Sequence, residues 1–326
     1  MKQTGPSLGP RITKGTTVAD RVRLISASKS DFEDWDAMTL KESIRMSEGR
    51  VVMGQHLLFA SQGLVRGVTN SELLFAFGAD MVMLNTFNFN DETNNPGLQG
   101  LTFAELKARC NRPIGVYLGC PGKNKPDQKK LYDPEGMLAT PEHIARAVQM
   151  GVDFIVLGGN PGSGTSIADV IKTTKYVKDT YGDQVLLFAG KWEDGIDEKV
   201  LGDPLADYDA KDVISQLIDA GADVIDFPAP GSRNGISVSH IQELVQFTHT
   251  YKPGTLAMCF LNSSVEGADA ETIRLVALKM KETGADIHAI GDGGFSGCTT
   301  PENVQQLSFS LKGKPYTYFR MASVNR

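Results

Sequence analysis

Short apolar runs alternate with longer amphipathic segments along most of the chain. Four of these runs follow a repeated phrase, Gly-Ala/Val-Asp, whose copies lie 73, 70 and 63 residues apart. The glycine closes a helical pattern and is typical of a left-handed helix cap, where a Cβ would be strained. The apolar run after it, bounded by turn residues, predicts a buried parallel strand. The phrases begin at Gly78, Gly151, Gly221 and Gly284.

Four further apolar runs lie between those four. Strands are therefore predicted to start near residues 51, 81, 114, 154, 185, 224, 255 and 287. The average step of about 34 residues is what a strand, a helix and two loops require. The segments between the runs are amphipathic, and Thr140 followed by Pro141 is a helix start signal. In residues 269–283 one helical face carries Ile273, Val276, Ala277 and Met280.

Eight strand–helix units in a row, with mostly apolar strands and no long linker, predict an α/β fold of the (βα)8 barrel type. A doubly wound open sheet is the alternative, which the even spacing and the two-unit repeat disfavour. Residues 50–326 are predicted to form this single barrel domain. Residues 1–49 precede it as an N-terminal extension with one helix, near residues 38–46, that wraps the barrel or covers its bottom.

Composition and charge narrow the functional classes. The chain has 326 residues, of which 41% are hydrophobic and 22% charged, as in ordinary globular proteins. A net charge of −6 without a long basic run argues against nucleic-acid or anionic-membrane partners. The N-terminus lacks the apolar core of a secretion signal, and the four scattered cysteines fit a reducing compartment. We therefore expect a cytoplasmic protein, and a homo-oligomer whose aromatic stretch 316–321 packs on the barrel or on a neighbouring subunit.

Polar residues at the strand ends indicate where chemistry occurs. In such barrels the active site lies at the carboxyl ends of the strands. The four repeated aspartates fall at the opposite ends, so we interpret them as turn and cap residues. The carboxyl ends instead carry amides, carboxylates and glycine-rich loops. Of the amides, Asn85 after the second strand and Asn160 after the fourth are predicted to orient the substrate.

Two glycine-rich loops are candidate anion sites. Residues 291–297 follow the last strand and precede a helix start, an arrangement whose backbone amides suit a phosphate. The alternative for this loop is a tight turn that binds nothing. Residues 158–166 form a second such loop, which is either an anion cradle or a flexible active-site loop. The predicted anion-binding residues are Gly162, Ser263, Gly291, Gly293 and Gly294.

Lys191 ends an otherwise apolar run. Alternation along a strand places it on one face with Leu187 and Ala189, and its amine is predicted to point into the barrel mouth. There it binds an anionic group or, if desolvation lowers its pKa, forms a Schiff base with a carbonyl. A lysine that leans out to solvent is the alternative.

Three further ionisable residues are catalytic candidates. His288 and Asp292 lie four apart, so both are predicted to look inward from the eighth strand and to do acid–base work, with a core histidine as the alternative. Asp226 sits in an apolar strand and needs a partner, such as Lys191 or a metal. Together with Glu193 it is a candidate Mg²⁺ ligand.

Several runs together resemble a known family. They are AFGAD, VDFIVLGGNPGSG, FAGK, AGADVIDFPAPG, GADIHAIGDGGFSG and YFRMA. Over about residues 35–326 the chain resembles a family of uncharacterised bacterial (βα)8-barrel proteins, loosely labelled phosphoenolpyruvate phosphonomutase-like. The resemblance implies the barrel, and the label implies Mg²⁺ held by clustered strand-end carboxylates. This chain departs from the phosphonomutase pattern at the second strand, which ends in Asn85.

These observations predict an enzyme that acts on a small, anionic, phosphorylated carbonyl metabolite, of the aldolase/lyase or isomerase type. Lys191 would bind the anion or polarise the carbonyl, and His288 or Asp292 would move the proton. No cofactor is certain. The alternatives are a Mg²⁺-dependent 2-oxo-acid lyase or mutase built on Asp226 and Glu193, a non-catalytic metabolite-sensing barrel, and an enzyme that uses FMN.

Overall fold

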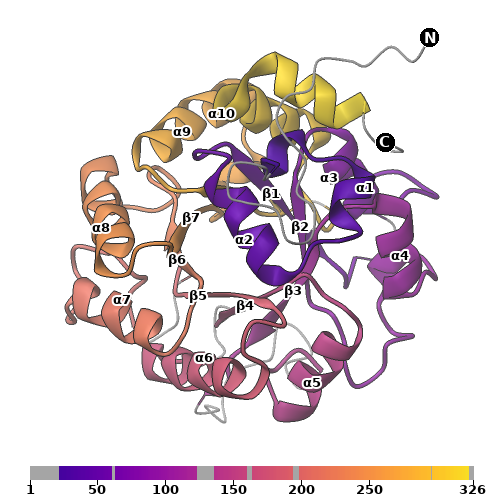
Figure 1. Ribbon diagram of the computed structural model, residues 1–326. Coiled ribbons are helices and arrows are strands. Elements are labelled where there is room, and N and C mark those ends of the chain that lie inside the picture. The colour runs from indigo at the N-terminus through magenta and orange to yellow at the C-terminus, as the bar shows by residue number, and fades with distance from the viewer. Residues whose placement is uncertain are drawn as a thin grey trace.

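Eight parallel strands close into a barrel in which each strand pairs with its neighbours in chain order, which confirms the predicted (βα)8 fold (Figure 1). The structure is a computed structural model that describes residues 22–60, 63–122, 136–159, 164–193, 198–294 and 296–322. The strands are β1 Val51–Leu57, β2 Met81–Asn85, β3 Ile114–Gly119, β4 Phe154–Gly158, β5 Leu186–Gly190, β6 Val224–Pro228, β7 Leu256–Leu261 and β8 Ile287–Ile290.

Helices surround the barrel, because each connection between parallel strands must return to the same end. The helices are α1 Lys29–Phe32, α2 Ala37–Arg45, α3 Asn70–Ala76, α4 Phe103–Cys110, α5 Pro141–Gln149, α6 Ile167–Tyr181, α7 Ala210–Asp219, α8 Val238–Tyr251, α9 Ala270–Glu282 and α10 Pro301–Ala322. The predicted start of α5 is confirmed, since the Thr140 side chain accepts a hydrogen bond from the His143 amide. Among the described helices, none has the length and apolar character needed to span a membrane.

Side chains of the strands alternate between two cores. The inner core fills the barrel and contains, for example, Met53, Phe188 and Met258. The outer core lies between strands and helices and contains the neighbouring positions, such as Val52 and Leu187. Buried parallel strands are apolar on both faces, so these two cores take up almost every strand residue.

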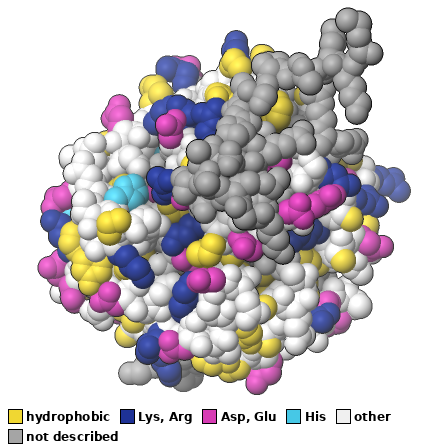
Figure 2. All heavy atoms as spheres, in the orientation of Figure 1, with side chains coloured by type: hydrophobic (Ala, Val, Ile, Leu, Met, Phe, Trp, Pro, Cys, Tyr) yellow, Lys and Arg dark blue, Asp and Glu magenta, His cyan; other side chains and the backbone are white. Residues whose placement is uncertain are grey.

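The N-terminal segment covers one end of the barrel. The helix predicted near residues 38–46 is α2, and its Leu40 and Ile44 belong to the inner core. Helices α1 and α2 lie across the end of the barrel that faces the viewer in Figure 1. On this face basic and acidic side chains are interspersed (Figure 2).

The four repeated aspartates each tie an even-numbered strand to the odd-numbered strand before it. At Asp80, for example, the backbone amide donates to the Val52 carbonyl at 2.7 Å and the carboxylate accepts from the Val52 amide at 2.9 Å. The same pair of hydrogen bonds recurs at all four aspartates, which confirms the prediction that these residues have a structural role. We call them the aspartate clamps: Asp80–Val52, Asp153–Ile114, Asp223–Leu187 and Asp286–Ala257.

Candidate active site

Three carboxylates gather at the carboxyl ends of the strands, and we call them the carboxylate cluster. Glu193 follows β5, Glu266 lies in the turn after β7, and Asp292 follows β8. The Asn262 side chain donates to Glu193 Oε1 at 3.2 Å, and the Gly293 amide donates to Glu266 Oε1 at 3.3 Å. The three carboxylates interact electrostatically: the charge of Asp292 raises the pKa of Glu193 and of Glu266.

Burial dominates the proton affinity of Glu193. It raises the pKa from 4.5 to about 7, and the nearby charge of Asp292 adds to this rise. The Arg233 charge, the Asn262 hydrogen bond and the Lys191 charge act in the opposite direction. Near neutral pH this carboxyl therefore exists in both its protonated and its ionised form.

The pKa of Glu266 is raised in the same direction for a similar reason. Burial raises its pKa from 4.5 to about 7, hydrogen bonds from its own amide and that of Gly293 oppose the shift, and the charges of Asp292 and Glu193 add to it. Thr299 and Asn303 fix the residue by donating to its backbone carbonyl at 2.6 and 2.9 Å. Its Oε2 atom is buried and has no hydrogen-bond partner among the described residues.

Aromatic rings close the barrel beneath the cluster. Trp192 stacks on Phe260 with ring centroids 5.5 Å apart, and Tyr117 meets Trp192 edge-on at 6.0 Å. Gly158 leaves room for these rings, since a Cβ there would come within 2.9 Å of Trp192. The Tyr117 hydroxyl is buried without a hydrogen-bond partner in the described part of the chain. Burial, and then the charge of Glu193, raise the pKa of Tyr117 well above 10.

The predicted phosphate loop is engaged by the protein itself. The Gly291 amide donates to the Leu261 carbonyl at 2.9 Å, and the Gly293 amide donates to Glu266. The Gly294 amide lowers the pKa of the Asp292 carboxyl, against the rise that burial causes. A phosphate at these amides would meet two carboxylates. The geometry therefore corrects the prediction that the loop presents open amides to an anion.

Lys191 lies on the other side of its strand from the predicted one. It does share a face with Leu187 and Ala189, but those two residues belong to the outer core, so this face looks toward the helices. The amine donates to the Thr165 carbonyl at 3.3 Å, and the side chain is 3% exposed. The prediction that it points into the barrel mouth was wrong, although its charge still reaches Glu193.

His288 is also turned outward. It pairs in register with Val52 of the outer core, and its Nε2 lies 3.1 Å from the Gly49 carbonyl. Burial lowers its pKa to about 4, so the ring is neutral near pH 7. Because β8 ends at Ile290, Asp292 lies beyond the strand and the two residues do not share an inward face. The predicted acid–base pair of His288 and Asp292 is therefore not formed.

Asp226 points into the barrel, between Gly190 and Met258 in register. It is fully buried, and neither carboxyl oxygen has a hydrogen-bond partner among the described residues. Burial raises its pKa well above 3.8, because the charged form is disfavoured away from water. The predicted partner Lys191 faces the other core, which corrects the expected ion pair.

A magnesium site built on Asp226 and Glu193 does not fit this arrangement. Asp226 lies one inner layer below the stacked rings of Trp192 and Phe260, whereas Glu193 follows Trp192 at the mouth. In the described part of the chain, no group of three or more His, Cys, Asp or Glu side chains is arranged to hold a metal ion.

Of the remaining predicted residues, Asn85 and Ser263 lie at the mouth of the barrel, and the other two fall outside the residues that the structure describes. Asn85 ends β2 on the inner face, and its Oδ1 accepts from the Thr86 amide at 2.7 Å. The Ser263 hydroxyl donates to Asn262 Oδ1 at 3.4 Å. Asn160 and Gly162 lie outside the described residues.

Sequence reasoning missed two residues of the mouth, Glu266 and Arg233. Both follow strands that were predicted, so a search of every charged residue after each strand would have listed them. What singles them out is their position beside Glu193, which sequence alone does not give.

Comparison with known proteins places the chain in one family. The sequence matches the family model described as Domain of unknown function (DUF7916) over residues 25–326. No curated protein matches it. The phosphonomutase label is not part of these findings and stays a prediction.

Solved structures of low identity share the barrel. A Rhizobium etli pyruvate carboxylase is 12% identical with a TM-score of 0.50, over 98% of this chain and 29% of that one. An HMG-CoA lyase from Brucella melitensis is 12% identical with a TM-score of 0.44, over 77% and 83%. An archaeal fructose 1,6-bisphosphate aldolase is 12% identical with a TM-score of 0.48, over 82% and 96%. The chain spans 52% of a structure of the carboxylase's carboxyl transferase domain. The likeness to the whole pyruvate carboxylase shows the fold alone.

Proposed function

The chain belongs to the DUF7916 family, and we propose that it is an enzyme of the lyase or isomerase type that moves a proton on a small anionic carbonyl metabolite. The observation that carries the proposal is the pair Glu193 and Glu266, whose pKa values burial raises to about 7. A carboxyl with a pKa near the working pH both accepts and releases protons efficiently. The pair lies at the end of the barrel where such folds carry their active sites.

In this proposal Glu193 is the base. Its ionised carboxylate takes the proton from the carbon next to the substrate carbonyl, and the electron pair of that C–H bond moves toward the carbonyl oxygen to form an enolate. The Tyr117 hydroxyl, buried and unpartnered among the described residues, donates a hydrogen bond to this oxygen as its charge develops. Its pKa, held well above 10, keeps the proton on the phenol.

Glu266 is the acid of the pair. When the deprotonated carbon carries a hydroxyl group, the intermediate is an enediolate. The protonated Glu266 carboxyl gives its proton to the former carbonyl carbon, the hydroxyl proton passes to the former carbonyl oxygen, and the C=O bond re-forms on the deprotonated carbon, which completes an isomerisation. Gly291 supports this role, because a Cβ at that position would lie 3.0 Å from Glu266 Oε1 and would crowd the carboxyl.

Arg233 is assigned to the anionic group of the substrate. Its charge is the largest of the influences that lower the pKa of Glu193, so it lies close to the proton-transfer group. A guanidinium binds a carboxylate through two parallel hydrogen bonds. Since the amides of residues 291–294 already have protein acceptors, the substrate's negative charge is placed at Arg233 rather than at the glycine loop.

Hydrogen–deuterium exchange tests the function without knowledge of the product. The protein is incubated in D₂O with a panel of 2-oxo acids and hydroxyketones, with and without phosphate groups, and loss of the proton next to the carbonyl is followed by NMR. We expect exchange on at least one compound, and a loss of roughly 100-fold or more in Glu193→Gln and Glu266→Gln.

Glu271→Gln is the matched control, because Glu271 is an exposed glutamate on α9 that pairs with Arg274. It should exchange at the wild-type rate. Absence of exchange on every compound, or exchange that persists in both glutamine variants, contradicts the proposed function.

A further inference from the structure

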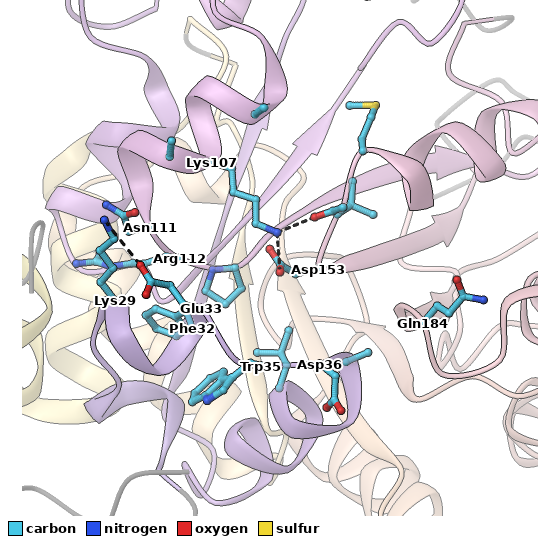
Figure 3. Close-up of a pocket in the computed structure, with 18 residues that line it drawn as sticks. Lys29, Phe32, Glu33, Trp35, Asp36, Lys107, Asn111, Arg112, Asp153 and Gln184 are labelled. Atoms are coloured by element: carbon cyan, nitrogen blue, oxygen red, sulfur yellow. Dashed lines mark hydrogen bonds and ion pairs between the residues drawn. The ribbon is translucent and has the colours of Figure 1, made fainter. Parts of the chain in front are cut away.

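A cavity of about 540 Å³ lies at the amino-terminal end of the barrel, opposite the carboxylate cluster. Its walls come from the N-terminal segment that contains α1 and the start of α2, from α4 and the turn that leads to β3, and from the turn before β4. Figure 3 shows these walls facing one another. The volume falls within the range of pockets that bind small molecules.

The aspartate clamps show why this position is open. Asp80 is 0% exposed, because Lys312 and Arg320 of α10 approach its carboxylate to 2.6 and 3.0 Å. Asp223 is 6% exposed, because Lys41 of α2 and Lys178 approach it to 2.8 and 3.4 Å.

The clamp of Asp153 lacks such a cover. Its side chain is 25% exposed, and Lys107 of α4 approaches it to 2.9 Å as its one cationic partner among the described residues. Asp153 and Lys107 both line the cavity, and Figure 3 shows the lysine reaching the Asp153 carboxylate. At Asp80 and Asp223 the chain supplies a second cation, and an occupant of the cavity would supply one at Asp153.

The opposite wall suits the body of such an occupant. Phe32 and Trp35 meet edge-on with ring centroids 5.0 Å apart and line the cavity from the N-terminal segment. Leu40 and Pro113 add apolar surface. Aromatic faces attract cations as well as flat apolar groups.

Charged side chains of both signs line the cavity. Three carboxylates line it, those of Glu33, Asp36 and Asp153. Lys29 lies 3.9 Å from Glu33, and Lys107 is held by Asp153 and by the Gly151 carbonyl at 2.6 Å. Arg112 also lines the cavity and donates to the Phe75 and Arg320 carbonyls at 3.0 and 2.7 Å. All three basic side chains that line the cavity are thus paired with acceptors of the chain.

We propose that this cavity is a second ligand site, which binds a small organic cation. An amine, amidine or guanidine group would lie against Asp153, and a flat apolar body would lie against Phe32 and Trp35. The site is independent of the proton-transfer chemistry at the other end of the barrel.

Benzamidine is a suitable probe, because it joins a cationic group to a flat ring. Benzamide has the same shape without the charge, and benzoate carries the opposite charge. Binding is measured by calorimetry and by the change in Trp35 fluorescence. The Trp35→Phe variant lacks this fluorescence signal and identifies its source. We expect saturable binding of benzamidine, at least 10-fold weaker binding of benzamide, and none of benzoate.

Two variants locate the site. Asp153→Asn should weaken benzamidine binding at least 10-fold, whereas Asp286→Asn removes a clamp remote from the cavity and should leave it unchanged. If Asp153→Asn does not fold, Ala108→Phe fills the cavity from α4 without touching the clamp and should abolish binding. Equal binding of benzamidine and benzamide, or wild-type affinity in either the Asp153 or the Ala108 variant, overturns the proposal.

Discussion

At the scale of single residues, burial has different consequences for three acidic side chains of the barrel. Glu193 and Glu266 have polar neighbours at the mouth, and their pKa values stop at about 7. Asp226 lies inside the barrel without a partner among the described residues, and its pKa is raised well above 3.8 by burial alone. A buried carboxyl with polar neighbours can serve proton transfer, whereas Asp226 lies below the mouth in surroundings that favour its neutral form.

Asp226→Asn tests this protonation state. The asparagine keeps the shape of the side chain and removes the ionisable group. Because the folded pKa is raised, the folded protein retains a proton that the unfolded chain releases above about pH 3.9. Wild-type stability should therefore fall relative to the variant as pH rises from about 4, by about 1.4 kcal/mol per pH unit until the folded group ionises.

Urea unfolding between pH 4 and pH 7 measures this difference. Asp207→Asn, on an exposed loop, is the matched control for the loss of one carboxylate. A difference between wild type and Asp226→Asn that stays constant with pH would show that Asp226 is ionised in the folded protein.

At the scale of elements, α10 is joined to the first half of the barrel through one buried ion cluster. Arg320 donates to Asp80 and to the Leu24 and Ala27 carbonyls, and Lys312 donates to Asp80 and to the Gly78 carbonyl. The last turns of α10 thereby connect the N-terminal segment to the clamp between β1 and β2.

Arg320→Met removes the central cation of this cluster. The methionine leaves two backbone carbonyls without their donor and Asp80 with one cation fewer, so we expect a loss of about 3–5 kcal/mol in the free energy of unfolding. Chemical unfolding followed by circular dichroism gives the value. Arg274→Met breaks the exposed pair with Glu271 on α9 and should change stability little. Equal effects of the two variants would mean that the buried cluster does not hold α10.

The strands and helices were predictable from the sequence, but which face of each strand points into the barrel was not. The spacing of apolar runs located each strand because a βα unit has a nearly fixed length. Alternation then showed that Lys191, Ala189 and Leu187 share a face. It did not show which face, because the strand is apolar on both sides and both cores are buried. Lys191 and His288 were therefore assigned to the barrel mouth when they belong to the outer core.

At the scale of the whole molecule, the location of the site followed from the fold, and its composition did not. A barrel places its chemistry at the carboxyl ends of the strands, and Glu193, Asp292 and Asn85 lie there as predicted. The pairing of Glu193 with Glu266 and Arg233 arises from loops after β5, β7 and β6, and their mutual distance is set only when the barrel closes. The raised pKa values come from burial, which is a property of the folded chain.

The two glutamates give the whole protein a characteristic dependence of stability on pH. Each has a folded pKa of about 7 and an unfolded pKa near 4.3. The unfolded chain releases these protons first as pH rises, so both groups favour the unfolded state increasingly between about pH 4 and pH 7.

The double variant Glu193→Gln with Glu266→Gln removes this contribution. At pH 8 it should be more stable than wild type, by on the order of 2 kcal/mol for each group after allowance for solvent screening, and near pH 4 the two proteins should be equally stable. Thermal and urea unfolding across pH 4–8 measure the difference, with Glu271→Gln as the control. A gap between wild type and double variant that does not widen toward pH 8 would show that the glutamates ionise normally, and with that the proposed acid–base pair would lose its physical basis.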